Sequence, residues 1–192
     1  MKKDLGKIPA VYPMPVLIVA AYDEAGVPCA MNAAWGMISG MDQITLFIDE
    51  DHKTVKNIHA SGAFTVALAD AAHVAPADYV GIATGNKVAD KFARSGLTAV
   101  KSAHVNAPII DQFPLTMECE LQTVIQQEDF HAVVGKIVNT CAEESILDEN
   151  GKVDVTKAGF LMFDQFRAGY YTTGEQAGLA WRSGRELMKD EP

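Results

Sequence analysis

The chain has 192 residues, of which 48% are hydrophobic and 21% are charged, and this is the composition of an ordinary globular protein. Its formal net charge of −9 gives no electrostatic attraction to nucleic acid or to an anionic membrane surface, so neither is expected as a partner. The three cysteines, Cys29, Cys119 and Cys141, include no close pair and no zinc-ligand spacing, which is typical of a reducing compartment.

The chain carries no pattern of a targeting or membrane segment. Two lysines near the N-terminus are not followed by an apolar core, and the apolar run over 11–21 is shorter than the ~20 residues that cross a bilayer. We therefore expect a cytoplasmic protein without a membrane partner. Repeats, low-complexity tracts and linkers are missing, so residues 1–192 are expected to form a single domain.

The first quarter of the chain predicts three strands. Residues 16–22 are continuously apolar after two prolines, which predicts a strand that is buried on both faces. The turn signal over 23–28 returns the chain as a second strand over 29–34, so these two strands are expected to form a hairpin. Glycines bracket residues 36–42, which predicts a loop, and a β-branched segment over 43–48 predicts a third strand.

The middle of the chain predicts helices around one strand. Helical spacing over 54–60 predicts a helix that Gly62 ends, and the alternating segment 63–69 predicts a strand. Two further short helices are expected over 75–82 and 87–95, within a stretch that is otherwise irregular.

The last third predicts two long strands and smaller elements. Residues 115–125 alternate between apolar and polar side chains, which indicates a strand with one solvated face, and residues 131–142 predict its neighbour. A helical turn is expected over 153–159 and a short apolar segment over 160–163. From residue 169 onward the chain becomes polar.

Strands joined by short turns, with helices inserted between some of them, favour a mainly β fold with a barrel core. A parallel doubly wound sheet would need regular helices of roughly 10–15 residues between its strands, and these are missing. The phosphate-binding, dinucleotide-binding, nucleophile-elbow and zinc-protease motifs are also missing, which weakens the case for hydrolases and dinucleotide-binding enzymes. We predict no metal site.

The stretch Asp49–Asn57 has the most suggestive local chemistry. It leads from a strand through an acidic loop into a helix, with His52, Lys53 and Thr54 at the start of that helix. A lysine cation, a hydroxyl and the free N–H groups of a helix end can together hold a phosphate. The alternative is a solvated turn in which Thr54 is an ordinary N-cap, and spacing alone leaves both open.

A second candidate stretch is Asn32-Ala33-Ala34-Trp35. Small residues beside an aromatic can let a flat ring lie close to the backbone, or the stretch is a strand end with a core tryptophan. His131 opens a strand after an acidic turn, where it can donate to a bound substrate or be simply exposed. Tyr170 and Tyr171 can stack on a ring or fill an interface.

Several stretches, taken in order and spacing, together resemble one family. They are Tyr12-Pro13-Met14-Pro15-Val16, Asn32-Ala33-Ala34-Trp35, His52-Lys53-Thr54-Val55-Lys56-Asn57-Ile58, Gly62-Ala63-Phe64-Thr65-Val66, Asp78-Tyr79-Val80-Gly81, Lys87-Val88-Ala89-Asp90-Lys91-Phe92 and His131-Ala132-Val133-Val134-Gly135-Lys136-Ile137-Val138. The chain is similar to the flavin reductase-like FMN-binding split barrels, and within them to the flavoredoxin-like branch. The resemblance covers roughly residues 9–171.

The resemblance implies a six-stranded antiparallel split barrel with flanking α-helices, which forms a homodimer with FMN near the subunit interface. It places the phosphate by the loop 49–54, the isoalloxazine ring by the segment 32–35 and a closing segment at 78–81. The residues that it implies for cofactor binding are Asn32, Ala33, Ala34, Trp35, Asp49, His52, Lys53, Thr54, Asn57, Asp78, Tyr79, Gly81, Lys91 and Tyr171. His131 is the candidate catalytic residue.

The resemblance leaves two functions open. One is NAD(P)H-dependent flavin reduction, with NADH or NADPH as a transient donor, and the other is a non-catalytic flavoredoxin-type carrier with a redox partner protein. A haem-binding split-barrel relative is a further alternative. Reductases of this family often have serine and threonine after the asparagine, where this chain has Ala33-Ala34-Trp35. A bulky Trp35 narrows the access of a nicotinamide, so the enzymatic status stays open.

Overall fold

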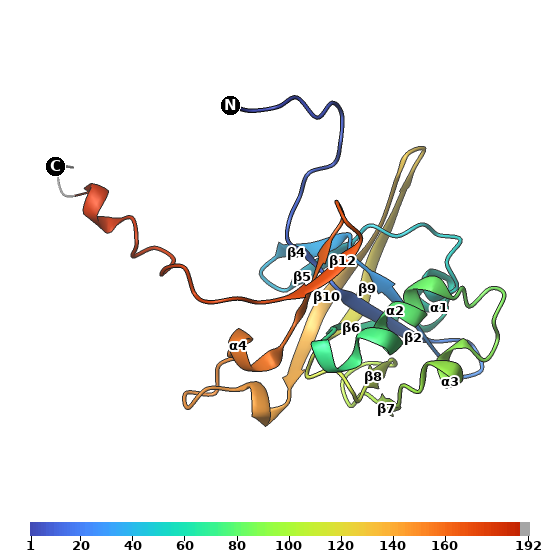
Figure 1. The fold of residues 1–192 in the computed structure, drawn as a ribbon. Coiled ribbons are helices and arrows are strands. Elements are labelled where there is room, and N and C mark those ends of the chain that lie inside the picture. Colours follow the sequence, from blue (N-terminus) through green and yellow to red (C-terminus); the bar gives the residue numbers. More distant parts are fainter. Residues whose placement is uncertain (189–192) are drawn as a thin grey trace.

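Seven antiparallel strands form the main sheet of the computed structural model, which describes residues 1–188 (Figure 1). The strands, in their order across the sheet, are β3 Pro28–Ala33, β2 Leu17–Tyr22, β6 Ala63–Leu68, β9 Leu115–Gln127, β10 Phe130–Ala142, β5 Gln43–Leu46 and β4 Gly36–Gly40. Strands β3 and β4 lie at opposite edges of the sheet, yet only Ala34 and Trp35 separate them in the chain. The sheet therefore curls until its two edges approach each other, which makes it a barrel.

Smaller elements surround the barrel. Two small sheets contain β1 Met14–Pro15, β11 Leu161–Asp164 and β12 Gly169–Thr172, and β7 Ala99–Lys101 and β8 Pro108–Ile110. The helices are α1 Lys53–Ser61, α2 Val74–Ile82, α3 Lys91–Ser95 and α4 Val155–Ala158, with 3₁₀ turns at Ala71–His73, Glu144–Ile146 and Arg185–Met188. Figure 1 shows α1, α2 and α3 together on one side of the barrel, where each contacts β3. No helix within residues 1–188 is long and apolar enough to cross a membrane.

Strand β2 is buried on both faces, as its continuous apolar sequence predicts. Leu17 and Val19 belong to the core inside the barrel. Ile18 and Ala20 point to the other face and pack in a second core with residues of α2, β8 and β11. Because successive side chains of a strand point to opposite faces, a strand between two cores has no polar positions.

The predicted loop over 36–42 is wrong, because Gly36–Gly40 is the edge strand β4. It pairs with β5 through its backbone, while Met37 and Ile38 are both exposed, so no alternation of buried and exposed residues marks it as a strand. Its first glycine allows close packing, since a Cβ there would lie 2.7 Å from Leu46 Cδ2. With β4 the main sheet has seven strands, where the resemblance implies six.

Other boundaries also differ from the predictions. The helix predicted over 87–95 begins only at Lys91, because the N–H groups of residues 87 and 88 bond to the carbonyl of Thr84 in a turn. The polar segment after residue 169 starts with a strand, β12, and the short pair β7–β8 was not predicted. The remaining predicted strands and helices are confirmed within a few residues.

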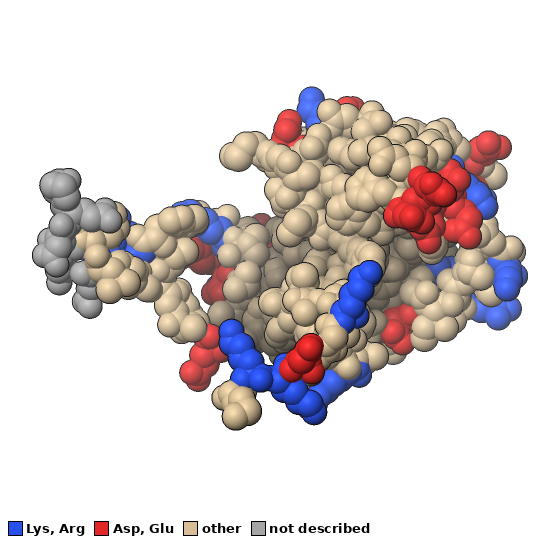
Figure 2. Space-filling view, turned by 90° about the horizontal axis from the view of Figure 1, so that it is seen from above, with Lys and Arg blue, Asp and Glu red and all other residues tan. Residues whose placement is uncertain are grey.

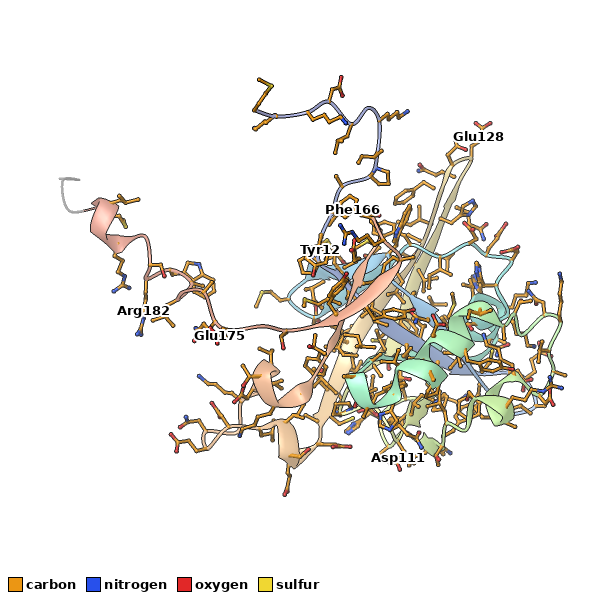
Figure 3. All side chains as sticks on the ribbon, viewed as in Figure 1. Tyr12, Asp111, Glu128, Phe166, Glu175 and Arg182 are labelled. Atoms are coloured by element: carbon orange, nitrogen blue, oxygen red, sulfur yellow. The ribbon has the colours of Figure 1, made fainter. Side chains whose placement is uncertain are left out.

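The N-terminal segment is attached to the turn between β11 and β12. Gln165 Nε2 donates to the carbonyl oxygens of Pro9 and Val11, at 3.1 Å each. Figure 3 labels Tyr12 and Phe166 at this junction. The N-terminal segment forms a wall of one of the cavities described next.

Candidate functional site

A cavity of ≈ 130 Å³ lies where α1 begins, between β3 and the end of α2. Its lining residues are Met31, Asn32, His52, Lys53, Thr54, Val80, Gly81, Ala83, Thr84, Gly85 and Lys91. We call it the anion pocket, because a helix N-terminus and two lysines converge on it and both attract negative charge.

Helix α1 presents unbonded N–H groups at the anion pocket. Its first helical bond runs from the N–H of Lys56 to the carbonyl of His52, at 3.2 Å, so the three preceding N–H groups have no partner within the helix. His52 is the N-cap and forms no side-chain cap. Thr54 lies buried within the first turn, so it is not the N-cap that the alternative interpretation required. The positive end of α1 therefore remains available to an anion.

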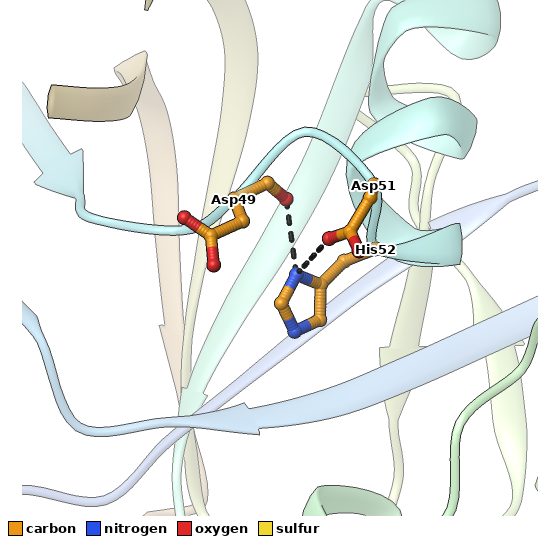
Figure 4. Close-up of side chains that lie close together, drawn as sticks. All are labelled: Asp49, Asp51 and His52. Atoms are coloured by element: carbon orange, nitrogen blue, oxygen red, sulfur yellow. Dashed lines mark hydrogen bonds and ion pairs between the residues drawn. The ribbon is translucent and has the colours of Figure 1, made fainter. Parts of the chain in front are cut away.

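The loop before α1 is held by His52 itself. Its Nδ1 lies 3.0 Å from the carbonyl oxygen of Asp49 and 3.3 Å from Asp51 Oδ1 (Figure 4). Ligand atoms of these three residues lie within 4.8 Å of one another, but both carboxylates are exposed, and exposed acidic groups are common without an ion. The interactions in Figure 4 therefore orient the loop, and they leave the cap position of α1 without a side-chain acceptor.

Lys91 is a largely buried lysine that lines the anion pocket. Only 5% of its surface is exposed, and within residues 1–188 its ammonium group has neither an ion pair nor a hydrogen bond. Burial lowers the pKa of Lys91, and the nearby Cys29 opposes that shift. Lys53, in contrast, is half-exposed and has Asp23 Oδ2 at 4.0 Å from its Nζ. Because lysines are almost never fully buried unless they are paired, Lys91 indicates an anionic ligand.

The loop after α2 closes the anion pocket from the other side. Asn86 Nδ2 donates to the carbonyl of Asp51 at 2.8 Å, which ties this loop to the one before α1. A Cβ at Gly85 would lie 3.1 Å from Lys53 Cγ and 3.2 Å from Cys29 Sγ. The loop backbone therefore packs directly on the pocket residues at a distance that a larger side chain would prevent.

A middle pocket of ≈ 250 Å³ continues from the anion pocket, with which it shares Asn32 and Gly81. Its lining residues are Asn32, Ala34, Asp78, Gly81, Ile82, Phe163 and Tyr170. Asn32 Nδ2 donates to the carbonyl of Ala77 at 3.1 Å, which fixes the amide against α2. A Cβ at Gly81 would lie only 3.0 Å from Asn32 Cβ, so the glycine lets α2 approach β3 at this point.

Tyr170 is the tyrosine of β12 that faces the middle pocket. Its hydroxyl donates to Asp78 Oδ1 at 2.8 Å. Burial, followed by this bond, raises the pKa of Tyr170 to about 12, so the phenol is a neutral donor at physiological pH. Tyr171, the residue carried over from the resemblance, lines none of the pockets described here, because neighbouring residues of a strand point to opposite sides.

An apolar pocket of ≈ 340 Å³ adjoins the middle pocket and shares Ala34 with it. Its lining residues are Pro9, Val11, Pro13, Met14, Pro15, Ala34, Trp35, Gly36, Met37, Phe47 and Gln165. Trp35 is 58% exposed at its rim, so it is not a core tryptophan. The three pockets share lining residues in sequence from the start of α1 to the link after β3, and we call them together the groove. Two lysines lie at one end of the groove and apolar side chains at the other.

The groove brings together most of the residues predicted for a cofactor site. They are Asn32, Ala34, Trp35, His52, Lys53, Thr54, Asp78, Gly81 and Lys91. Ala33, Asp49, Asn57, Tyr79, Tyr171 and His131 line none of the three pockets. Thr84 and Gly85 line the groove and were not predicted as cofactor ligands, and Tyr170, which the sequence offered together with Tyr171 for stacking on a ring or filling an interface, lines it as well.

Two of the residues outside the groove have polar atoms without partners. His131 lies on β10 opposite Gln126, and its Nδ1 is buried without a hydrogen bond within the described residues. Asn57 lies one turn along α1 from Lys53, and its Nδ2 is also buried without a hydrogen bond within the described residues. Neither residue lines one of the three pockets, so their functional roles stay predictions.

The sequence and the fold match one protein family. The flavin reductase like domain model matches residues 10–168. The flavoredoxin of Desulfovibrio vulgaris (Miyazaki F) is 34% identical with a TM-score of 0.90, over 96% of this chain and 100% of that chain. The flavoredoxin from Methanosarcina acetivorans is 25% identical with a TM-score of 0.88, over 98% of this chain and 100% of that chain.

Other matches have a lower sequence identity or cover less of the chain. A Shewanella frigidimarina structure, described provisionally as a flavin reductase with a split barrel domain, is 17% identical with a TM-score of 0.76. It covers 88% of this chain and 86% of its own, and it shows the fold alone. Uncharacterized proteins of Aquifex aeolicus and Aeropyrum pernix are 34% and 27% identical over 68 and 128 residues, or 35% and 66% of this chain. These matches span 35% and 48% of the two relatives' own lengths.

Replacing Lys91 by methionine tests whether its charge serves the fold or a ligand. A buried, unpaired ammonium costs folding free energy, so Lys91→Met should leave the free energy of unfolding unchanged or raise it by up to ~2 kcal/mol. Urea denaturation in phosphate-free buffer measures this, with Lys56→Met on the exposed side of α1 as the control. A clearly less stable Lys91→Met protein would show that the charge has a stabilising partner.

The lowered pKa of Lys91 determines how the folding stability of the protein changes with pH. Between the native pKa of Lys91 and its ordinary value of 10.5, the unfolded chain binds more protons than the native chain, so this group adds stability as pH rises. The cost of Lys91 is fully present below its native pKa and disappears toward pH 10.5. The stability advantage of Lys91→Met over the parent chain should therefore shrink over that range.

Proposed function

The chain belongs to the flavin reductase-like domain family, and we propose that it works there as an FMN-binding electron-transfer protein. The observation that carries the proposal is the anion pocket, where the unpaired, buried Lys91 meets the uncapped N-terminus of α1. A flavin mononucleotide has a phosphate at one end, a polar ribityl chain in the middle and a flat ring at the other end. This order matches the anion, middle and apolar pockets along β3.

The residues of the groove would bind and orient the cofactor. A bound flavin supplies the redox chemistry by taking up electrons and passing them on. Lys91 and the first N–H groups of α1 hold the phosphate, and the Tyr170 hydroxyl offers a neutral donor in the middle pocket. Ala33 and Ala34 have small side chains, which let a ring approach the backbone of β3. None of these roles needs a nucleophilic side chain.

Electron transfer to a redox partner protein is favoured over direct reduction by a nicotinamide because of Trp35. Its half-exposed ring stands at the rim of the apolar pocket, where a second molecule has to approach the flavin. A large aromatic ring at that place restricts stacking of a nicotinamide, whereas single electrons can pass through it. NADH and NADPH remain the donors of the alternative function, flavin reduction.

We also propose that the protein is a homodimer, as the resemblance implies. Large apolar side chains are exposed at and beside the apolar pocket, including its lining residue Met37 with 69% of its surface exposed and the neighbouring Ile38 on β4. Figure 2 shows that uncharged surface covers much of the face seen from above, with acidic side chains gathered at one side. Exposed apolar surface of this kind marks interaction sites.

FMN binding should depend on Lys91 more than on Lys53. Loss of a charge-assisted hydrogen bond in Lys91→Met should weaken binding by about 1.5–3 kcal/mol, which is roughly a 10- to 150-fold higher Kd. Lys53→Met should cost less, because Asp23 already shares that charge. Titrating the cofactor-free variants with FMN and with riboflavin, which lacks the phosphate, measures the effect. An equal loss for both ligands, or no loss for FMN, would contradict the phosphate assignment.

The carrier and reductase functions differ in their response to nicotinamides. We expect bound FMN to stay oxidised on anaerobic mixing with excess NADH or NADPH in a stopped-flow instrument, and to be reduced by dithionite. The Trp35→Ala variant should admit a nicotinamide better and be reduced faster. Rapid reduction of the parent protein by either nucleotide would instead establish a reductase, and a haem spectrum would rule out the flavin.

The dimer is tested by sedimentation velocity. We expect the protein to sediment with twice the 20.7 kDa mass of the chain. Met37→Glu places a charge on the exposed face of β4 and should shift the population toward monomer. Val155→Glu, at an exposed position on α4, is the matched control and should leave the dimer intact. A parent protein that stays monomeric at all concentrations would refute the proposal.

A further inference from the structure

The C-terminal segment, residues 173–188, extends away from the barrel, and we call it the arm (Figure 1). At its base, the hydroxyl of Thr173 donates to the carbonyl of Val155 at 3.2 Å. Beyond Thr173, no hydrogen bond or ion pair within residues 1–188 joins the arm to the barrel. The polar contacts of its own chain therefore do not hold the arm in place.

The end of the arm is ordered by its own hydrogen bonds. The N–H of Leu179 donates to Ser183 Oγ at 2.8 Å, and this hydroxyl donates to the carbonyl of Leu179 at 3.0 Å. Arg185 Nε donates to the carbonyl of Trp181 at 3.2 Å. The turn holds Trp181 at a φ of 58°, in the left-handed region that bulky residues rarely adopt. It presents the indole to the outside, because 93% of Trp181 is exposed.

The arm carries apolar and basic side chains that lack partners within the described residues. Its exposed apolar residues are Leu179, Trp181, Leu187 and Met188. Arg182 and Arg185 have no ion pair within residues 1–188. Exposed apolar surface of this kind marks an interaction site, and the arginines favour a partner surface that is acidic.

An exposed acidic surface lies beside the apolar pocket. Phe47 lines the pocket, and the acidic loop 49–51 follows it in the chain. The rings of Phe47 and Phe130 are 5.6 Å apart, and the turn before Phe130 is acidic as well (Figure 3). Gln126 of the same hairpin donates to Glu50, which connects the loop with the hairpin. We call the exposed residues of this surface the acidic rim: Asp49, Glu50, Asp51, Glu128 and Asp129.

The arm and the surface that complements it belong to the same chain, which favours a second copy as the occupant. Figure 1 shows the arm leaving the barrel on the side of β4 and of the N-terminal segment, and both of these line the apolar pocket. Residues 173–179 can reach up to roughly 20 Å when extended, which exceeds the radius of gyration of roughly 16 Å for a chain of this length. Two chains that face each other on this side can exchange arms, and two-fold symmetry makes each contact twice.

We propose that the arm of each chain lies on the apolar pocket of the other chain, where Trp181 of the partner subunit packs against Trp35 and Met37. The two arginines of the arm then meet the acidic rim. The proposal rests on the homodimer proposed above and makes the second copy part of the cofactor site. The partner's indole closes the end of the groove at which the flavin ring would lie, so each site is complete only in the dimer.

Cross-linking of mixed full-length chains tests the contact. Met37→Cys chains with an affinity tag are mixed with untagged Ala180→Cys chains, which keep Trp181, and a short bismaleimide is added. We expect the main cross-linked product to contain one chain of each kind, identified by its mass. In the control, tagged Val100→Cys chains, altered at an exposed position of β7, replace Met37→Cys and should not give this product. The native cysteines are present in both mixtures and supply the same background.

Sedimentation velocity measures what the arm contributes to the dimer. Trp181→Ala, and separately the pair Arg182→Glu and Arg185→Glu, should raise the dissociation constant of the dimer about tenfold or more, because a central aromatic and paired charges are lost. Lys101→Glu, on the exposed side of β7, is the matched control and should leave it unchanged. Unchanged dissociation constants in both arm variants would overturn the proposal.

The arm contact and the homodimer can fail separately. A protein that sediments as a dimer but gives no mixed cross-link would refute the arm contact and keep the dimer. A cross-link that forms only within single chains of the Met37→Cys and Ala180→Cys double variant would place the arm on its own pocket and also refute the exchange. A chain that stays monomeric would refute both, while titration with FMN still decides the cofactor assignment.

Discussion

The two-residue link between β3 and β4 is the constraint on which the rest of the structure depends. It joins strands at opposite edges of a seven-stranded sheet, so the sheet has to close on itself. In the closed sheet, β3 pairs with β2, and helices α1 and α2 also contact β3. Asn32 on β3 and Ala34 in the link therefore line the pockets, and the groove runs from the anion pocket to the link itself.

In the anion pocket, the groups that would favour ligand binding lower the stability of the unliganded fold. Lys91 is a residue with only 5% of its surface exposed, and a lysine withdrawn from water to this extent, without a partner in the described chain, destabilises the protein on its own. The uncapped start of α1 adds N–H groups that no side chain satisfies. Both costs disappear when a phosphate enters, which makes the same groups a source of affinity.

Local patterns predict the strands whose side chains enter a core, and they miss a strand that exposes its side chains. Residues 63–67 of β6 are all buried, whereas β4 exposes both Met37 and Ile38 and exists only through its pairing with β5. In the site, Lys53 can be found because it starts a helix. The role of Lys91 was predicted only from the family resemblance, since nothing in the local sequence shows that this lysine is buried. Choosing between two adjacent tyrosines requires the register of β12, which places Tyr170 in the groove.

The most direct test of the central claim is a crystal structure of the protein with FMN. We predict the phosphate in the anion pocket, with its oxygens about 2.7–3.2 Å from Lys91 Nζ and from the first N–H groups of α1. The flavin ring should lie along Ala34 toward the apolar pocket. A phosphate bound elsewhere, with Lys91 still unpaired, would contradict the assignment of this groove to the cofactor.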